Sequence, residues 1–335
     1  MSQIPVPSQI IVPTPAKPVV PLPVPSSAVG PGSSSVNITP SAPINGVPEI
    51  FTRLGFVPAG STRTRLFITS EGPTGSGKTH FIRTMPGPIG VIDFDRGTEG
   101  VLDVFRNSAG LPVNVYGQPI LRKTIEFAEF DEGGKSTSAS ELAAARSNYQ
   151  IFKYLVEQMT RSSEVRTLVV DTGGAAYSLA QAARFGQLAA VGEVPPNMWT
   201  SMQMEYENLF LQAYEAGCNV LVTHRQGSKF KGLAGEKELK GYKLMPFVGQ
   251  VHLVHQKKVS RVPVDPSNPM TGMRELVELS IKVEKCRQRW TLNGHEFPIV
   301  MLGEDPATGV MQSIGGTFLD VAKAVLPITT DSDWI

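Results

Sequence analysis

Cysteine is nearly absent from this sequence of 335 residues, which contains only Cys218 and Cys286. Two cysteines cannot build the disulfide framework of a small secreted domain, and this usage fits a reducing, cytoplasmic setting. Long apolar runs are also lacking, because no stretch approaches the roughly 18 residues of a membrane span. The N-terminus lacks the basic-then-apolar layout of a signal peptide. We therefore expect neither secretion nor a membrane partner.

An excess of charge of one sign is lacking as well. The 31 Lys and Arg nearly balance the 30 Asp and Glu, so the formal net charge is +1. No global field therefore draws the chain to nucleic acid or membrane, and a charged partner site must come from local clustering. The histidines show no metal-ligand spacing and no Cys pair accompanies them, so no zinc site is expected. Apolar residues make up 41%, enough to bury a sizeable core.

Proline is concentrated at the N-terminus. The first 48 residues hold 12 of the 27 prolines and one charged residue, Lys17. This Pro/Val/Ser mixture has no helix or strand period and predicts a disordered tail, 1–48, with polyproline character. The tail is either a docking ligand for a protein partner or a solvated extension. A folded domain is expected over 49–330.

Strand and helix patterns alternate beyond the tail. Short apolar, β-branched runs predict strands at 65–70, 89–94, 165–171, 219–224, 276–283 and 297–301. Apolar residues at spacings of three and four predict helices at 78–85, 139–161, 199–213 and 317–326. The segment 172–197 is rich in small residues and nearly uncharged, and we expect a mobile loop there. This alternation predicts an α/β fold with a mainly parallel sheet flanked by helices.

The clearest motif lies between the first predicted strand and the first predicted helix. It reads Gly72-Pro73-Thr74-Gly75-Ser76-Gly77-Lys78-Thr79, the G-x-x-x-x-G-K-T pattern of a phosphate-binding loop, or P-loop. Its glycines let successive backbone N–H groups converge on phosphate oxygens at the start of a helix. Lys78 then reaches the β- and γ-phosphates of ATP, and the Thr79 hydroxyl binds Mg²⁺. The motif predicts a Mg²⁺-dependent ATPase.

Carboxylates at the ends of two further strands complete this prediction. Asp171 follows a β-branched apolar run and is expected to hold Mg²⁺ and its waters opposite the loop. Hydrolysis also needs a carboxylate that takes a proton from the attacking water. Asp93 and Asp95 are both candidates after the second strand. The alternative is that Asp95 belongs to an ordinary charged turn.

A local basic cluster lies between residues 225 and 261. Nine Lys or Arg stand there against Glu236 and Glu238, an excess of seven positive charges. A flexible, Gly-containing loop of this charge, interleaved with Phe230 and Tyr242, suits the backbone and stacked bases of single-stranded DNA. The alternative is a solvated basic loop. The DNA contacts that we expect are Arg225, Lys229, Lys231, Lys240 and Lys243.

Together these residues resemble the RecA-like ATPases, and more closely the phage-encoded nucleotide-binding proteins linked to single-strand annealing and recombination. The resemblance covers about 65–288 and implies a RecA-like core with Asp95 as the general base. It also implies a γ-phosphate sensor at His224, where phage relatives have histidine and RecA itself has glutamine. Lys285 and Arg287 resemble the basic pair that RecA-like filaments insert onto the nucleotide of a neighbouring subunit.

The resemblance implies an ATP-hydrolysing recombination or annealing protein that binds single-stranded DNA as a homo-oligomer, a filament or ring. Its place would be the host cytoplasm if it is phage-encoded. RecA members have glutamate where this chain has Asp95, and the shorter side chain leaves open a nucleotide-gated DNA-binding module with negligible turnover. A scaffold that docks through the proline-rich tail is a further alternative.

Overall fold

The computed structural model describes residues 64–94, 96–126, 138–186, 188, 194–228, 237–239, 241–265, 268–304 and 311–335. The expected tail, 1–48, lies outside them. The strands are β1 (Phe67–Gly72), β2 (Ile89–Asp93), β3 (Ile120–Thr124), β4 (Thr167–Asp171), β5 (Asn219–Ser228), β6 (Lys237–Leu239), β7 (Val251–Asp265), β8 (Asn268–Cys286), β9 (Glu296–Glu304) and β10 (Met311–Ile314). The helices are α2 (Lys78–Ile82), α3 (Ala139–Arg161), α4 (Gly173–Phe185), α6 (Pro196–Glu215), α7 (Met245–Val248), α8 (Phe318–Val325) and α9 (Asp331–Trp334), with a 3-10 turn at Trp290–Leu292.

These strands form one ten-stranded sheet in the order β10-β9-β8-β7-β1-β5-β4-β2-β3, with β6 paired to β5. The strands from β7 to β3 in this order are parallel, and β8, β9 and β10 continue the sheet as antiparallel strands. Strand β5 lies between β1, which leads into the P-loop, and β4, which ends at Asp171. The mainly parallel sheet flanked by helices that the sequence predicts is confirmed.

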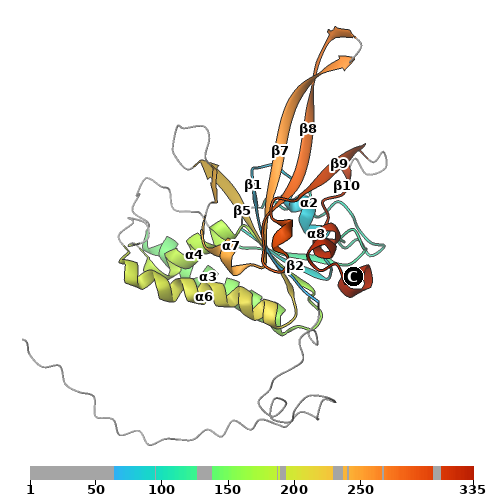
Figure 1. The fold of residues 1–335 in the computed structure, drawn as a ribbon. Coiled ribbons are helices and arrows are strands. Elements are labelled where there is room, and N and C mark those ends of the chain that lie inside the picture. Colours follow the sequence, from blue (N-terminus) through green and yellow to red (C-terminus); the bar gives the residue numbers. More distant parts are fainter. Residues whose placement is uncertain are drawn as a thin grey trace, which may run out of the picture. The chain divides into compact units, whose positions relative to one another are not determined.

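Each face of the sheet carries its own apolar core, because successive side chains of a strand point to opposite faces. Phe67 of β1 belongs to the core beneath α3, α4 and α6. Its neighbours Leu66 and Ile68 belong to the other core, beneath α2 and α8. Figure 1 shows these two groups of helices on opposite sides of the sheet. The P-loop therefore leaves the sheet on the side of α2 and α8. Among the described helices, none combines the length and apolar character needed to cross a membrane.

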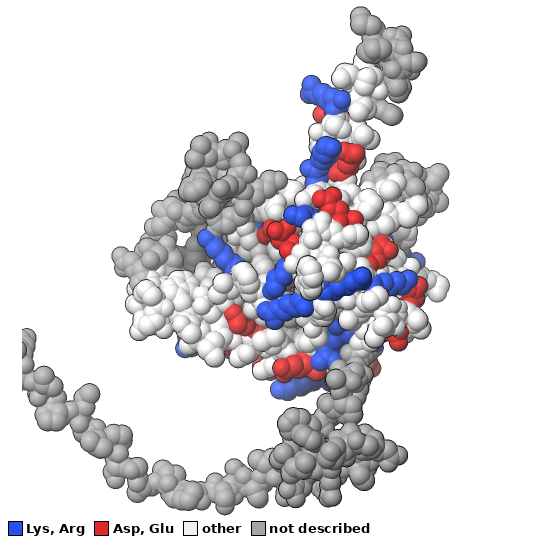
Figure 2. Space-filling view, viewed as in Figure 1, with Lys and Arg blue, Asp and Glu red and all other residues white. Residues whose placement is uncertain are grey.

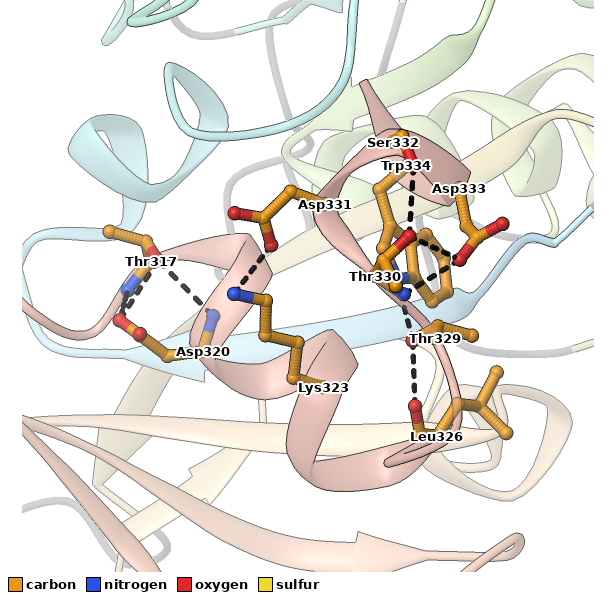
Figure 3. Close-up of polar contacts among 10 residues, drawn as sticks. All are labelled: Thr317, Asp320, Lys323, Leu326, Thr329, Thr330, Asp331, Ser332, Asp333 and Trp334. Carbon is orange, nitrogen blue, oxygen red and sulfur yellow. Dashed lines mark hydrogen bonds and ion pairs between the residues drawn. The ribbon is translucent and has the colours of Figure 1, made fainter.

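The C-terminal segment closes the second core. Capping boxes at Thr317 and Thr330 start α8 and α9 (Figure 3). The fully buried Trp334 packs edge-on against Phe318, with ring centroids 5.3 Å apart. The backbone N–H of Phe318 donates a hydrogen bond of 2.8 Å to the Thr84 hydroxyl, just after α2. The C-terminal segment therefore contacts the chain directly after α2, the short helix that follows the P-loop.

Two expectations about loops were wrong. The segment 172–197 contains helix α4, whose first backbone groups are capped by the Thr172 side chain. Its small residues permit close packing, since a Cβ on Gly173 would lie 2.4 Å from a Val222 methyl carbon. The basic segment 225–261 is likewise not one loop, because it includes the end of β5, β6, α7 and most of β7. Helix α2 also ends at Ile82 instead of residue 85. Over residues 83–85 each backbone N–H donates to the carbonyl three residues earlier, which is the tighter 3-10 pattern.

Strand β7 was not predicted, because most of it does not lie inside the sheet. It pairs with β1 over Val251–Val254. Farther along, β7 pairs with β8. Beyond the Lys257–Leu279 pair, towards the hairpin tip, the two strands form a ribbon without another described strand beside it. Figure 1 shows this hairpin reaching beyond the rest of the sheet. A ribbon exposed on both faces needs no apolar run, and positive and negative side chains lie side by side along it (Figure 2).

Candidate nucleotide site

The P-loop has backbone geometry that depends on its glycines. Gly75 and Gly77 have φ angles of 74° and 92°, in the left-handed region that favours glycine. Gly72 is required by close approach, since a Cβ there would lie 2.7 Å from both the His255 carbonyl oxygen and Ser76 Oγ. The loop can therefore wrap with its backbone N–H groups turned inward, which is the arrangement that binds phosphate.

Lys78 lies along this loop. Its Nζ donates hydrogen bonds to the carbonyl oxygens of Gly72 (2.7 Å) and Pro73 (2.8 Å). Ser76 Oγ donates to the same Pro73 oxygen at 2.8 Å. The ammonium group is thus held beside the loop. Its contact with the β- and γ-phosphates stays a prediction.

The candidate carboxylates end neighbouring parallel strands and are register partners, Asp93 on β2 and Asp171 on β4. Asp171 accepts a hydrogen bond from the Thr223 hydroxyl of β5. Asp93 is fully buried and accepts one from the Thr98 hydroxyl. Asp95 lies outside the described residues, so its role as general base stays a prediction.

A pocket of about 270 Å³ connects the P-loop to the β4 carboxylate. Its wall is formed by Thr74, Gly75, Ser76, Gly77, Lys78, Thr79, His80, Gly97, Val101, Asp171, Thr172 and Arg225. Thr79 and Asp171 thus border the same space, and hydroxyl and carboxylate oxygens are ligands that suit Mg²⁺. The described residues contain no cluster of three His, Cys, Asp or Glu that could hold a metal ion. A Mg²⁺ ion held by Thr79 and Asp171 would complete its coordination with phosphate oxygens and water.

His224, which ends the predicted strand 219–224, and Arg225, which follows it, lie in different surroundings. Arg225 lies in the wall of the pocket, whereas sequence reasoning placed it among the DNA contacts. His224 is fully buried, and its ring lies 2.7 Å from where a Cβ on Gly173 would be. Since Gly173 follows Asp171 by two residues, His224 adjoins the turn after the β4 carboxylate. Its role as γ-phosphate sensor stays a prediction.

Sequence reasoning missed Glu71, the register partner of His224 on β1. Gln226 donates a 3.1 Å hydrogen bond to its carboxylate, and His252 Nε2 lies 3.8 Å away. Burial raises the pKa of Glu71, but the His252 ring and the Gln226 amide outweigh it and leave the pKa lowered. A charged residue one place before the P-loop, within an apolar strand, was the signal for this polar cluster.

His255 of β7 lies directly beneath the P-loop. It is fully buried, and its ring packs edge-on against Phe81 of α2 with centroids 5.6 Å apart. Burial and the nearby Lys78 ammonium lower its pKa to about 3, against a smaller opposing effect of the Ser76 backbone. A neutral imidazole therefore packs beneath the P-loop.

A second, larger cavity of about 460 Å³ adjoins the first and shares Gly77 and His80 with it. Its walls carry apolar and aromatic side chains, among them Phe105 and Tyr116. The guanidinium of Arg83 stands 4.0 Å from the centre of the Phe105 ring. A largely apolar cavity with a few polar groups is typical of a ligand pocket.

The remaining predicted residues are spread more widely. Lys229, Lys231 and Lys240 lie outside the described residues. Lys243 is exposed just before α7, but Tyr242 is a core residue, 3% exposed and stacked on Tyr177, so it is not a surface for bases. Lys285 donates a 2.6 Å hydrogen bond to the Pro246 carbonyl. Lys285 and Arg287 lie towards the amino ends of β1 and β7, away from this chain's own P-loop.

The comparisons with known proteins add little to this geometry. No family model and no curated protein matches the chain. Among solved structures, a crystal structure of the RadB recombinase is similar at 16% identity and a TM-score of 0.38, over 75% of this chain and 91% of that chain.

Proposed function

We propose that this chain binds ATP with Mg²⁺ in the two adjoining cavities and hydrolyses it. The observation that carries the proposal is the pocket in which the glycine-dependent P-loop, Lys78, Thr79 and Asp171 face one space. The neighbouring 460 Å³ cavity, reached past Gly77 and His80, has room for the base and ribose. A nucleotide therefore fits better than free phosphate.

Each side chain has a definite task in this proposal. The P-loop N–H groups and Lys78 bind the β- and γ-phosphates, while Thr79 and Asp171 hold Mg²⁺. The bound Mg²⁺ supplies neutralisation of phosphate charge. Asp95 accepts the proton of the attacking water, and Arg225, from the pocket wall, contacts phosphate or the DNA beyond it.

We further propose that the ATPase serves DNA recombination or single-strand annealing. The support is the RecA-like arrangement of the motifs together with the excess of seven positive charges over residues 225–261. Lys229, Lys231, Lys240 and Lys243 would contact the single strand, with His224 coupling their segment to the γ-phosphate. In a homo-oligomer, Lys285 and Arg287 would reach a neighbouring subunit's nucleotide, and the tail 1–48 would dock a protein partner.

The test is steady-state phosphate release with and without single-stranded DNA. Lys78→Ala removes the cation that the pattern places at the β- and γ-phosphates, so turnover should collapse. The control is Lys123→Ala, on the exposed end of β3, which should hydrolyse ATP at the parent rate. Parent-like turnover by Lys78→Ala would exclude this site as the ATPase centre. Tight ATP binding without turnover in the parent would instead support the nucleotide-gated module.

A further inference from the structure

A second lysine reaches the P-loop from strand β7. A methyl group placed on the Gly75 Cα would lie 3.6 Å from Lys257 Nζ. His255, two residues earlier on the same strand, contacts the loop at Gly72. Because alternate residues of a strand share a face, Lys257 and His255 both lie on the P-loop side of β7.

The Lys257 ammonium is available to a ligand. The side chain is exposed, and among the described residues it has neither a carboxylate partner nor a hydrogen bond. The next residue, Lys258, points to the other face and pairs with Glu278 at 3.3 Å. The two adjacent lysines therefore differ in surroundings while carrying the same charge.

The position of Lys257 along the loop identifies the part of a nucleotide that it meets. The apolar cavity for the base adjoins the phosphate pocket at Gly77 and His80. Gly75 lies farther from that cavity along the loop, so a triphosphate whose base occupies the cavity has its last phosphate towards Gly75. A cation at this end contacts the terminal phosphate more strongly than the first two.

We propose that Lys257 is a second phosphate-binding lysine that distinguishes nucleoside triphosphate from diphosphate. This rests on the function proposed above. The Lys257 ammonium, which lies beside Gly75, pairs with the terminal phosphate of a bound triphosphate. A diphosphate lacks this partner.

Titration calorimetry of the full chain with Mg²⁺ tests this, using ADP and a non-hydrolysable ATP analogue. Lys257→Met should weaken binding of the analogue by about tenfold or more, the scale of a lost charged hydrogen bond, and change ADP affinity less than about twofold. Lys257→Arg should restore most of the difference. Lys258→Met, with the same loss of net charge, should bind both nucleotides like the parent.

The outcomes separate this inference from the proposed function. If the parent binds neither nucleotide, the nucleotide site itself is wrong. If the parent binds both and Lys257→Met weakens both equally, or neither, Lys257 does not read the terminal phosphate. If Lys258→Met weakens binding of the analogue as much as Lys257→Met does, the effect comes from the loss of net charge alone, and the inference is wrong.

Discussion

Asp93 and Asp95 are two residues apart, and we expect different consequences from mutating them. Asp95→Asn removes the proposed proton acceptor while keeping its shape, so ATP affinity should persist and turnover should fall roughly a hundredfold or more. Asp93→Asn weakens a fully buried hydrogen bond from Thr98 and should lower the free energy of unfolding by about 1–3 kcal/mol. Phosphate release and urea unfolding measured on both variants check this. Loss of turnover in a stable Asp93→Asn protein, with an active Asp95→Asn protein, would move the base to Asp93.

His255 makes the stability of the fold depend on pH. Its pKa falls from the ordinary 6.5 to about 3 in the folded chain, so the unfolded chain takes up a proton below pH 6.5 while the folded chain does not. The contribution of the neutral ring to the free energy of unfolding is fully present above pH 6.5 and is lost as pH falls towards 3. Between pH 7 and pH 5 the parent should lose about 2 kcal/mol more than His255→Gln.

Urea unfolding at the two pH values measures this difference. His295→Gln is the matched control, because His295 is exposed, and it should keep the parent's pH dependence. A parent and a His255→Gln variant with equal losses would show that the ring is protonated without cost beneath the P-loop.

At the scale of elements, the sequence predicts a helix or strand where one face is buried. The periodic stripe of α3 gave its bounds, and the apolar runs located β2, β4 and the start of β5. Helix α4 was missed because its glycines and alanines serve close packing against the sheet and resemble a loop in composition. Strand β7 was missed because its outer part is exposed on both faces and has no apolar run.

Only part of the candidate site could be proposed from the sequence. The P-loop and Asp171 follow from local patterns, since a glycine turn and a strand-ending carboxylate are read within a few residues. The place of Arg225 in the pocket wall and of Lys257 beside Gly75 could not be predicted in this way. Whether a basic side chain lies near the P-loop depends on which face of its strand it occupies and on which strand lies next to β1, and only the fold supplies both.

The basic segment 225–261 gives a prediction at the element scale. Each Lys or Arg that touches a DNA phosphate releases counterion, so log affinity for single strands falls with log salt by about 0.7 per contact. Neutralising Lys229, Lys231 and Lys240 together should flatten this slope by about two units while nucleotide affinity is unchanged. Fluorescence titration at several salt concentrations measures the slope, and Lys123→Met, on β3, is a control outside this segment. A triple variant with the parent's slope would remove these lysines from the DNA interface.

In the whole molecule, the pocket beside the P-loop and the basic segment share structural elements. Strand β5 supplies Thr223, which binds the Asp171 carboxylate, then Arg225 in the pocket wall, and then enters the basic segment. Within that segment the chain returns against α4, where a Cβ on Gly241 would lie 2.5 Å from the Gly174 Cα. Arg225 and Gly241 therefore both lie beside residues close to Asp171.

This arrangement predicts that ATP and single-stranded DNA change each other's affinity. A non-hydrolysable ATP analogue should alter the dissociation constant for a single strand by several-fold or more, and DNA must alter the affinity for the analogue by the same factor, because linkage is reciprocal. The two titrations, each with and without the saturating second ligand, measure both factors at one salt concentration. Gly241→Ala strains the backbone where the chain packs against α4, because Gly241 has a φ of 104°, and it should reduce the coupling. The control is Gly294→Ala, in an open turn with a φ of 87°, which should leave the coupling unchanged. If neither ligand changes the other's affinity, the protein is an ATPase whose nucleotide site is independent of DNA. If the two measured factors differ, the two titrations do not report the same complex.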